Sequence, residues 1–477
     1  MKSPVVLFLA CCVVSPALAD DTAPIPPEPK PRPEEHEPGS PPTAASTPTG
    51  FSFGSYGRVN LGVDGNGHEG YATNVVSHGS RLEEPNYLEL DLYYTGAVGG
   101  SDARWRVVLA PAFTGSLFHY SGDFSSQIAI RNAYVETEHV GLHGLSFWAG
   151  SRMLRGDDIY LFDYWPLDNL NTVGAGSSLR AGHLDLQLHG GLNRLDDPAI
   201  YQTEQTPARG LGPPGSALVL DRPRSVLSMK ATYRLGTDGS PSGSKISLYG
   251  ELHHISNGSE INVSQMVTTK LPAETGFVLG GQIGAWLRPY TFANLFVRYA
   301  TGLGVYGDIT QPQTVDLTHS SAAARELVLA LSANYETSIV GVMVGGFLRT
   351  YSDPSGLDFN NNDYVEGIFA VRPQLYPSRY FHIAAELSYQ SRHYSGLDPL
   401  LERQLKPAVW RASILPIISP TGAGTYARPI IYAVATVSSL NQDALDTLFT
   451  APDIRYGTST VLYLGVGAEW WFQSSYR

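Results

Sequence analysis

Strict alternation of polar and apolar residues returns again and again between residue 51 and the end of this chain. Successive side chains of a strand point to opposite faces, so each such segment would have one apolar and one polar face. We therefore expect an all-β protein. The clearest segments are YGRVNLGVD (56–64), NYLELDLYY (86–94), HLDLQLHGGL (183–192), KISLYGEL (245–252) and FHIAAELSYQ (381–390).

The first nineteen residues have the features of a secretory signal peptide. Lys2 precedes an apolar run from residue 5 to residue 14, and Ala17-Leu18-Ala19 forms an A-x-A cleavage site. Cys11 would allow lipoprotein processing instead. After residue 19 no apolar run approaches the roughly 20 residues that a membrane helix needs. The sequence thus predicts an exported protein without a helical anchor.

Export, many alternating segments and no membrane helix together favour a transmembrane β-barrel over a soluble sandwich. Residues 51–477, at about 24 residues per strand and connection, would form roughly 16–18 antiparallel strands, enough to surround an aqueous channel. The Pro-, Asp-, Asn- and Gly-rich stretches 195–222 and 352–364 suit long extracellular loops. Ten prolines fall in residues 20–50, which predicts a disordered periplasmic spacer between the signal and the barrel.

Composition and motifs argue against several other functions. The net charge of −12 and the lack of a basic block disfavour nucleic-acid binding. Both cysteines lie inside the predicted signal peptide, so the mature protein would have no disulfide, no catalytic thiol and no cysteine-ligated metal site. No zinc-protease, P-loop, nucleophile-elbow or dinucleotide-binding motif is present. The segment DFNNNDYVE (358–366) departs from a calcium loop, because Asp363 stands where the loop needs glycine. We therefore expect no catalysis, no cofactor and no metal.

The last strand candidate places aromatic rings on both of its faces. Trp470 and Phe472 share the apolar face, while Trp471 shares the polar face with Glu469. Sugars need this pair of groups, since their C–H faces stack on rings and their hydroxyl groups bond to charged side chains. Membrane-interface belts are the default explanation for most tyrosines, but a weaker one for Trp471, which the alternation directs inward. Other rings with a charged neighbour of the same parity are Tyr56 with Arg58, Tyr87 with Glu89, and Tyr426 with Arg428.

Around these residues the chain resembles the maltoporin, or carbohydrate porin, family. The resemblance covers about a third of the barrel, at both ends and around a central segment. Its motifs are FGSYGRVNLGVDGNG (53–67), RLEEPNYLELDL (81–92), IRNAYVE (130–136), FWAGSRMLRGDDIYLFDYWPLDNLNTVGAG (147–176), TYARPIIYAVATV (425–437) and GVGAEWWF (465–472).

The resemblance implies an 18-stranded, trimeric outer-membrane channel for maltodextrins or related oligosaccharides. Positions that match the family's run of sugar-stacking rings are Tyr56, Tyr87, Tyr426 and Trp471. Positions that match its polar track are Arg58, Arg81, Glu89, Arg131, Asp158 and Asp163, with Trp165 in place of a tyrosine.

The chain departs from the family pattern at several positions. A slide phenylalanine aligns with Leu295, beside Phe296, and a constriction arginine aligns with Gly156, beside Arg155. For the ring that a neighbouring subunit supplies, the nearest aromatic residue is Phe124 or Tyr120. Five residues follow Phe472, where the family ends on its aromatic assembly signal.

We interpret the chain as a channel for facilitated diffusion of oligosaccharides, with Trp471 as a stacking ring and Glu469 as a partner for sugar hydroxyls. One alternative is a general or anion-leaning porin that lacks sugar specificity. A second is an outer-membrane enzyme or adhesin that acts through its long loops. The expected partners are an oligosaccharide, outer-membrane lipid and two further copies of the chain.

Overall fold

The computed structural model describes residues 49–115, 127–193, 203–207, 216–220, 222–236, 242–262, 267–306, 320–354, 363–449 and 457–474. The predicted signal peptide, nearly all of the predicted spacer, both cysteines, Tyr120, Phe124 and the last three residues lie outside these ranges.

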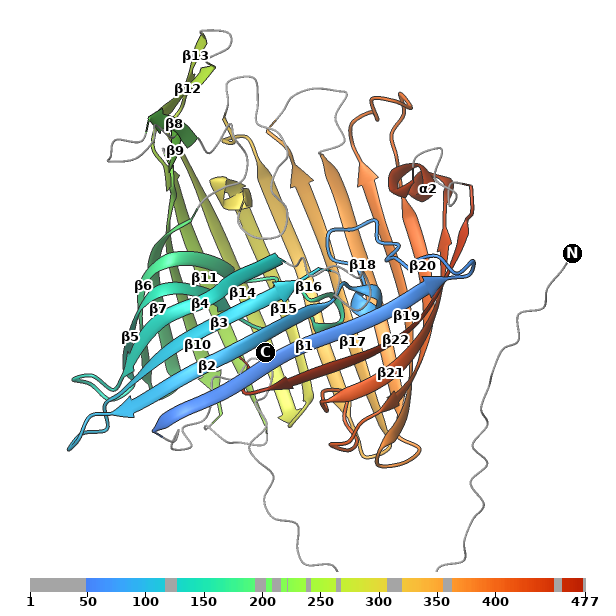
Figure 1. Ribbon diagram of the computed structural model, residues 1–477, viewed down its shortest axis with the longest axis horizontal. Coiled ribbons are helices and arrows are strands. Elements are labelled where there is room, and N and C mark those ends of the chain that lie inside the picture. The colour runs from blue at the N-terminus through green and yellow to red at the C-terminus, as the bar shows by residue number, and fades with distance from the viewer. Residues whose placement is uncertain are drawn as a thin grey trace, which may run out of the picture. The chain divides into compact units, whose positions relative to one another are not determined.

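Eighteen strands form a single antiparallel sheet, and each strand pairs with the next barrel strand along the chain. The first strand also pairs with the last, from Ser55 opposite Phe472 to Asp64 opposite Tyr463, so the sheet closes into a barrel (Figure 1). The predicted fold class is confirmed. The strands are β1 (Gly50–Asp64), β2 (Tyr87–Ala97), β3 (Arg104–Thr114), β4 (Gln127–Glu138), β5 (Leu145–Arg155), β6 (Asn169–Ala181), β7 (Leu184–Asn193), β10 (Arg224–Leu235), β11 (Gly243–Ile255), β14 (Glu274–Arg288), β15 (Thr291–Gly302), β16 (Arg325–Glu336), β17 (Val340–Ser352), β18 (Tyr364–Leu375), β19 (Phe381–Tyr394), β20 (Ala408–Ile418), β21 (Ile430–Leu440) and β22 (Thr460–Phe472).

Smaller elements occupy the longer connections, which alternate with short turns along the chain. Two hairpins and the helix α2 (Gln442–Leu448) lie at the upper end of the barrel in Figure 1. Among the described residues no helix is long and apolar enough to cross a membrane. The hairpins are β8 (Thr203–Pro207) with β9 (Ser216–Leu220) and β12 (Gly258–Asn262) with β13 (Val267–Leu271), and the 3₁₀ helices are η1 (Arg81–Glu83), η2 (Tyr160–Phe162) and η3 (Leu303–Tyr306).

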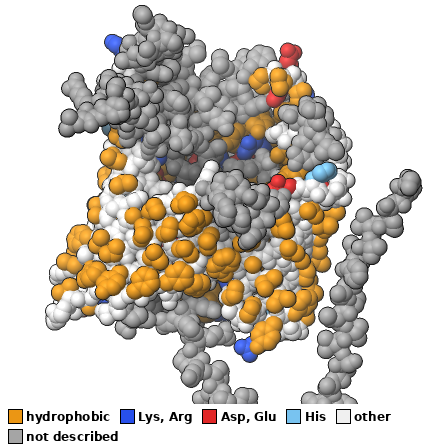
Figure 2. Space-filling view, in the orientation of Figure 1, with side chains coloured by type: hydrophobic (Ala, Val, Ile, Leu, Met, Phe, Trp, Pro, Cys, Tyr) orange, Lys and Arg blue, Asp and Glu red, His pale blue; other side chains and the backbone are white. Residues whose placement is uncertain are grey.

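The strands present apolar side chains outward and polar side chains inward. In β7 the outward Leu188 and Leu192 are 49% and 48% exposed, whereas the inward Asp185 and His189 are 8% and 3% exposed. Figure 2 shows hydrophobic side chains spread over the visible outer face, with few charged groups among them. A barrel that spans lipid needs this arrangement, because lipid meets only its outer face.

The segment 65–86, which connects β1 to β2, folds into the barrel, and we call it the first inner loop. Thr73 Oγ1 donates to Ser438 Oγ on β21 at 2.8 Å, and Ser77 Oγ donates to Glu366 Oε1 on β18 at 2.5 Å. Ser80 Oγ donates to Glu386 Oε1 on β19 at 2.5 Å. The loop therefore lies against the wall formed by β18–β21.

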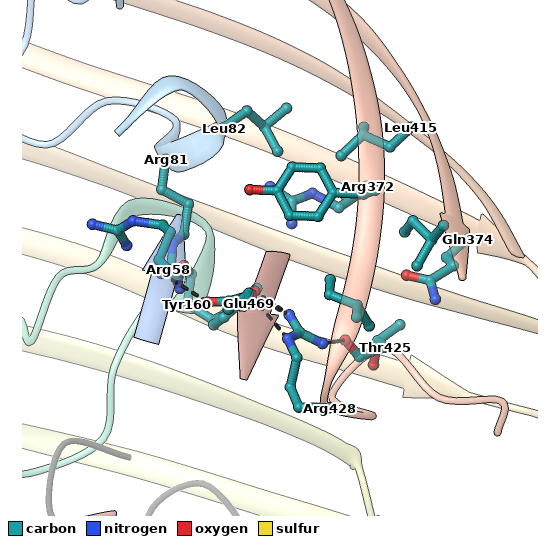
Figure 3. A pocket seen from close by; sticks show the side chains of 13 residues that line it. Arg58, Arg81, Leu82, Tyr160, Arg372, Gln374, Leu415, Thr425, Arg428 and Glu469 are labelled. Carbon is teal, nitrogen blue, oxygen red and sulfur yellow. Dashed lines mark hydrogen bonds and ion pairs between the residues drawn. The ribbon is translucent and has the colours of Figure 1, made fainter. Parts of the chain in front are cut away.

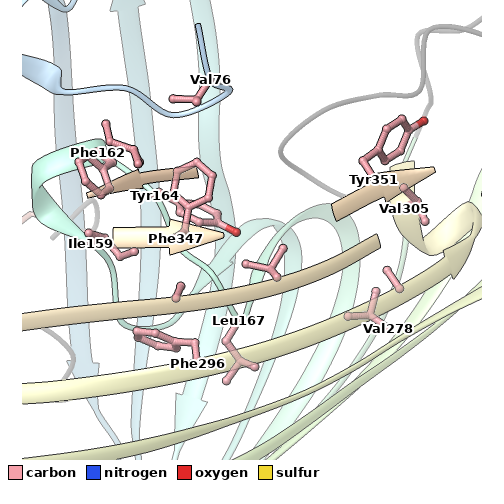
Figure 4. Packing of buried hydrophobic residues seen from close by; sticks show 14 of the residues in the cluster. Val76, Ile159, Phe162, Tyr164, Leu167, Val278, Phe296, Val305, Phe347 and Tyr351 are labelled. Atoms are coloured by element: carbon pink, nitrogen blue, oxygen red, sulfur yellow. The ribbon is translucent and has the colours of Figure 1, made fainter. Parts of the chain in front are cut away.

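The segment 156–168, which connects β5 to β6, also folds inward, and we call it the second inner loop. Its apolar side chains pack on the inner wall beside Phe296 and Phe347, in the largest buried cluster of the described residues (Figure 4). Gly345 of β17 leaves the space for this packing, since a Cβ atom there would lie 2.6 Å from Ile159 Cγ2. Gly280 of β14 likewise leaves space for Leu167, since a Cβ atom on Gly280 would lie 2.6 Å from Leu167 Cδ1.

Two ion pairs fix the base of the second inner loop. Lys245 Nζ lies 2.7 Å from Asp157 Oδ2, and Lys230 Nζ lies 2.7 Å from Asp168 Oδ2. Burial alone would raise the pKa of Asp157, but Lys245 and Lys230 outweigh it and hold that pKa below its ordinary value. The carboxylate thus stays charged and keeps its partners.

The segment 419–429, between β20 and β21, is the third element that folds inward, and we call it the inner turn. Thr425 Oγ1 donates to Glu336 Oε2 at 2.7 Å and lies 3.1 Å from Asn334 Oδ1, both on β16. The Thr425 Cγ2 methyl also occupies the space that a Cβ atom on Gly341 would need. The inner turn thereby places Tyr426 and Arg428 in the barrel interior.

Candidate channel constriction

A connected group of aromatic rings crosses the barrel interior where the inner segments meet. The ring centroid of Tyr56 lies 5.8 Å from that of Tyr87 and 6.5 Å from that of Trp471. Tyr160 then joins Trp471, at 6.0 Å, to Tyr426, at 5.5 Å. Three of the four predicted stacking rings are therefore in direct succession, and Tyr160 links the fourth to them.

The rings differ in how much surface they present. Tyr56 is fully buried, and Tyr160 is 4% exposed, whereas Tyr87, Tyr426 and Trp471 are half-buried. A ring can stack on a sugar only through an open face. The surface available to a ligand thus comes from Tyr87, Tyr426 and Trp471. The buried Tyr56 and Tyr160 rings pack against these three rings.

Glu469 is the centre of a hydrogen-bonded network beneath these rings. Tyr160 OH donates to its Oε2 at 2.6 Å, and Tyr56 OH donates to its Oε1 at 3.2 Å. Arg81 Nη2 lies 3.0 Å from Oε1, and Arg428 Nη2 lies 2.8 Å from Oε2. The carboxylate is 4% exposed and bonded at both oxygens, and these contacts hold the rings and the arginines. They leave little room for a sugar hydroxyl, the partner that the sequence suggested for Glu469.

Four arginines and Glu469 line a pocket beside the rings. Its volume is about 500 Å³, which includes space open to solvent. Figure 3 shows Arg428 reaching from the inner turn to Glu469, with Arg81 approaching the same carboxylate from the first inner loop. Leucine and isoleucine side chains of β20 and β21 complete the walls. The lining residues are Arg58, Arg81, Leu82, Tyr160, Arg372, Gln374, Leu415, Ile417, Thr425, Arg428, Ile430, Tyr432 and Glu469.

The pocket arginines are matched by carboxylates. Arg58 Nη1 lies 2.5 Å from Glu84 Oε2, and Arg372 Nη2 lies 2.6 Å from Glu386 Oε2. Burial alone would lower the pKa of Arg81, but Tyr56 and Glu469 outweigh it and raise that pKa well above its ordinary value. Each of these guanidinium groups is therefore held by a carboxylate.

A second polar group surrounds Tyr87. Tyr87 OH donates to Glu89 Oε2 at 2.6 Å and accepts from Arg131 Nη1. The same Arg131 Nη1 also lies 3.1 Å from Glu89 Oε2. Glu89 is fully buried, and the Arg131 guanidinium also lies 5.7 Å from the centre of the Tyr87 ring. The predicted Tyr87, Glu89 and Arg131 therefore act as one unit.

The remaining predicted residues come from the second inner loop. Trp165 is 5% exposed and packs with Tyr56, and the Arg155 guanidinium lies 3.7 Å above its ring. Asp163 follows η2 with a left-handed backbone, φ 51° and ψ 46°, which ends that helix. Asp158 and Asp163 are both half-buried on the loop.

Three features of this region differ from the sequence expectation or went beyond it. Tyr426 and Arg428 lie in the inner turn, because β21 begins only at Ile430, so strand parity was the wrong argument for them. Phe296 does face inward, with Leu295 outward, but the second inner loop covers it. Tyr160 was not predicted, and its only sequence signal is its place in the aromatic run IYLFDYW.

A family model described as LamB porin matches residues 51–472, nearly the whole described barrel. The chain belongs to the LamB porin family. Members of this family are porin channels of the outer membrane, which agrees with the closed barrel, its apolar outer face and its charged interior. Family and fold indicate a channel rather than an enzyme.

Curated relatives match over a shorter stretch. Maltoporins from two strains of Vibrio cholerae serotype O1, El Tor Inaba N16961 and Classical Ogawa 395, are 27% identical over 149 residues. This match covers 30% of the chain and 35% of each relative, so the chain spans about a third of the length of these maltoporins.

Solved outer-membrane proteins are similar across most of the chain at low identity. The outer membrane channel DcaP of Acinetobacter baumannii has a TM-score of 0.47 and 11% identity, covering 89% of this chain and 98% of that one. OccD3 of Pseudomonas aeruginosa has a TM-score of 0.44 and 10% identity, covering 89% and 91%. At these identities the likeness concerns the fold alone.

Proposed function

We propose that this porin mediates facilitated, saturable diffusion of oligosaccharides of the maltodextrin type. The observation that supports this most is the run of rings from Tyr87 to Tyr426, in which Tyr87, Trp471 and Tyr426 are only half-buried. Sugar rings would stack on these faces, and the surrounding guanidinium groups would bond their hydroxyl groups.

Weak binding at several neighbouring positions suits a channel, because a substrate must both enter and leave. Each aromatic stack contributes about 0.5–1.5 kcal/mol beyond the area it buries. Loss of one ring should therefore weaken sugar binding roughly two- to tenfold without closing the channel.

The proposal includes the organisation that the family resemblance implies. The chain would be exported with residues 1–19 as its signal peptide, residues 20–50 would form a periplasmic spacer, and three copies would assemble in the outer membrane. The polar positions that accompany the rings would be Arg58, Arg81, Glu89, Arg131, Asp158 and Asp163, with Trp165 beside them.

The test is single-channel conductance of the refolded barrel in a planar bilayer, with maltohexaose and then sucrose added in steps. We expect concentration-dependent, saturating block by at least one sugar. The variant Trp471→Ala should weaken that block and keep folding and ion conductance. Trp470→Ala is the matched control, since Trp470 lies on the opposite face and its Nε1 donates to Ser55 Oγ at 3.1 Å.

A general or anion-leaning porin is the second candidate, and one observation favours it. Tyr56 and Trp165 are buried, so the exposed ring surface is interrupted between Tyr87 and Trp471. Under this alternative no sugar would change the open current, and Trp471→Ala would behave like Trp470→Ala. That pair of results would rule out the stacking role and leave the barrel as an unselective channel.

A further inference from the structure

Two short turns at the end of the barrel opposite the hairpins and α2 bring two histidines and an aspartate together. Asp102 lies in the turn 98–103 between β2 and β3, and His139 and His143 lie in the turn 139–144 between β4 and β5. One ligand atom from each of the three residues lies within 4.8 Å of the others. The turns meet because β3 and β4 are paired strands.

The backbone of the second turn holds its two histidines side by side. His139 has a positive φ of 60°, and Gly141 and Gly144 have φ values of 76° and 83°. The two imidazole rings stack with centroids 4.4 Å apart and planes 8° apart. His143 Nδ1 lies 2.9 Å from Asp102 Oδ2 across the two turns. The arrangement depends on both hairpins and is not visible in the linear sequence.

We propose that Asp102, His139 and His143 form a binding site for a divalent transition-metal ion, with Zn²⁺ as the test ion. Two imidazoles and a carboxylate are a ligand set that zinc uses, with water at the remaining position. The Gly144 N–H donates to His139 Nδ1 at 2.9 Å. A metal ion bound at Nδ1 would use the lone pair that accepts this hydrogen bond, and one bound at Nε2 would leave the proton on Nδ1. Either way the hydrogen bond is lost, so we expect a moderate affinity for the metal ion.

The site lies where the barrel wall has its shortest ladder. β4 and β5 pair only from Ala133 opposite Ser151 to Glu138 opposite Ser146, fewer pairs than between any other neighbouring barrel strands described. Because a bound ion joins the β4–β5 turn to the start of β3, it ties this short hairpin to the rest of the sheet. A ligand that binds only the folded barrel also stabilises it.

Isothermal titration of the untagged, refolded chain with ZnCl₂, and separately with MgCl₂, tests the proposal. We expect saturable Zn²⁺ binding that Mg²⁺ does not reproduce, because Mg²⁺ prefers oxygen ligands. His143→Ala and Asp102→Asn should each lower the Zn²⁺ affinity at least tenfold. His183→Ala is the control, an exposed histidine in the next turn of the same end, and it should leave the affinity unchanged.

Heat-modified migration in SDS gels checks that each variant forms the barrel, and thermal unfolding gives a second readout. Zn²⁺ should raise the unfolding temperature of the wild-type barrel and of His183→Ala, but not that of His143→Ala. Absence of saturable Zn²⁺ binding would overturn the proposal. So would a Zn²⁺ affinity that both His143→Ala and Asp102→Asn retain.

Discussion

Gly345 controls how far the second inner loop can approach the barrel wall. An added Cβ atom would lie 2.6 Å from Ile159 Cγ2, 3.2 Å from Phe162 Cε2 and 3.5 Å from Leu161 Cδ1, all on that loop. Carbon atoms in contact normally stay about 3.5–4.0 Å apart. The variant Gly345→Ala must therefore move the loop by roughly 1 Å, away from β17 and toward the open interior.

The energetic cost of this change follows from overpacking a tight interface. One extra methyl group in such a place costs about 1–3 kcal/mol of folding free energy. The base of the loop cannot follow freely, because Asp157 and Asp168 are held by Lys245 and Lys230. We therefore expect a folded barrel with a narrower constriction and a lower single-channel conductance.

Conductance of Gly345→Ala in a planar bilayer, beside that of Gly281→Ala, checks the reasoning. Gly281 lies on β14, where the nearest atom to an added Cβ is Ser247 O at 3.4 Å, so its variant should conduct like the wild type. If the Gly345→Ala variant kept wild-type conductance and stability, Gly345 would not determine the position of the second inner loop. If both variants lost conductance equally, the effect would not come from the second inner loop.

Two further predictions concern the packing of the inner loops. Burial lowers the pKa of His78, which stacks on Tyr164 with centroids 4.5 Å apart, to about 4. The unfolded chain then binds more protons between pH 6.5 and pH 4, so the free energy of unfolding should fall as the pH drops through this range, by about 1.4 kcal/mol per pH unit at most. His78→Phe keeps the stack and should flatten this part of the stability curve, and an unchanged slope would contradict the assignment. Lys245→Met leaves the Asp157 carboxylate buried without its main counter-ion and should cost about 3–5 kcal/mol in urea unfolding, whereas the exposed Lys406→Met should cost little. A loss near zero for Lys245→Met would mean that this pair does not fix the loop.

The barrel itself could be predicted from the sequence because its cause is local. A strand between lipid and water must alternate, so each strand carries its own evidence, as the outward Leu188 and inward His189 of β7 illustrate. Length alone indicated roughly 16–18 strands, and the family resemblance indicated 18, the number observed. The family resemblance then supplied the order of the site residues, and the structure brings Tyr56, Tyr87, Trp165 and Trp471 into one cluster.

The inner segments could not be predicted in the same way, because their positions depend on contacts between distant parts of the chain. Nothing near Gly345 in the sequence indicates that Ile159 packs against it, and nothing near Thr425 points to Glu336. Residues 425–429 were assigned to a strand because the motif TYARPIIYAVATV (425–437) runs without a break into β21. Whether a polar segment lies outside a barrel or inside depends on partners that only the fold brings close.

The same dependence explains why the network around Glu469 could not be predicted from its position in the sequence. Parity on β22 correctly placed it inward beside Trp471, but two arginines and two phenols from four other segments converge on it. Removing a charge from water is costly unless it is paired, so a carboxylate at this depth needs such partners. Its partners in turn fix the rings on either side, Tyr56 and Tyr160. Both rings lie against Trp471, so under the proposed function a ligand would meet a Trp471 ring already held in place and would not have to order it, which reduces the entropy cost of that weak contact.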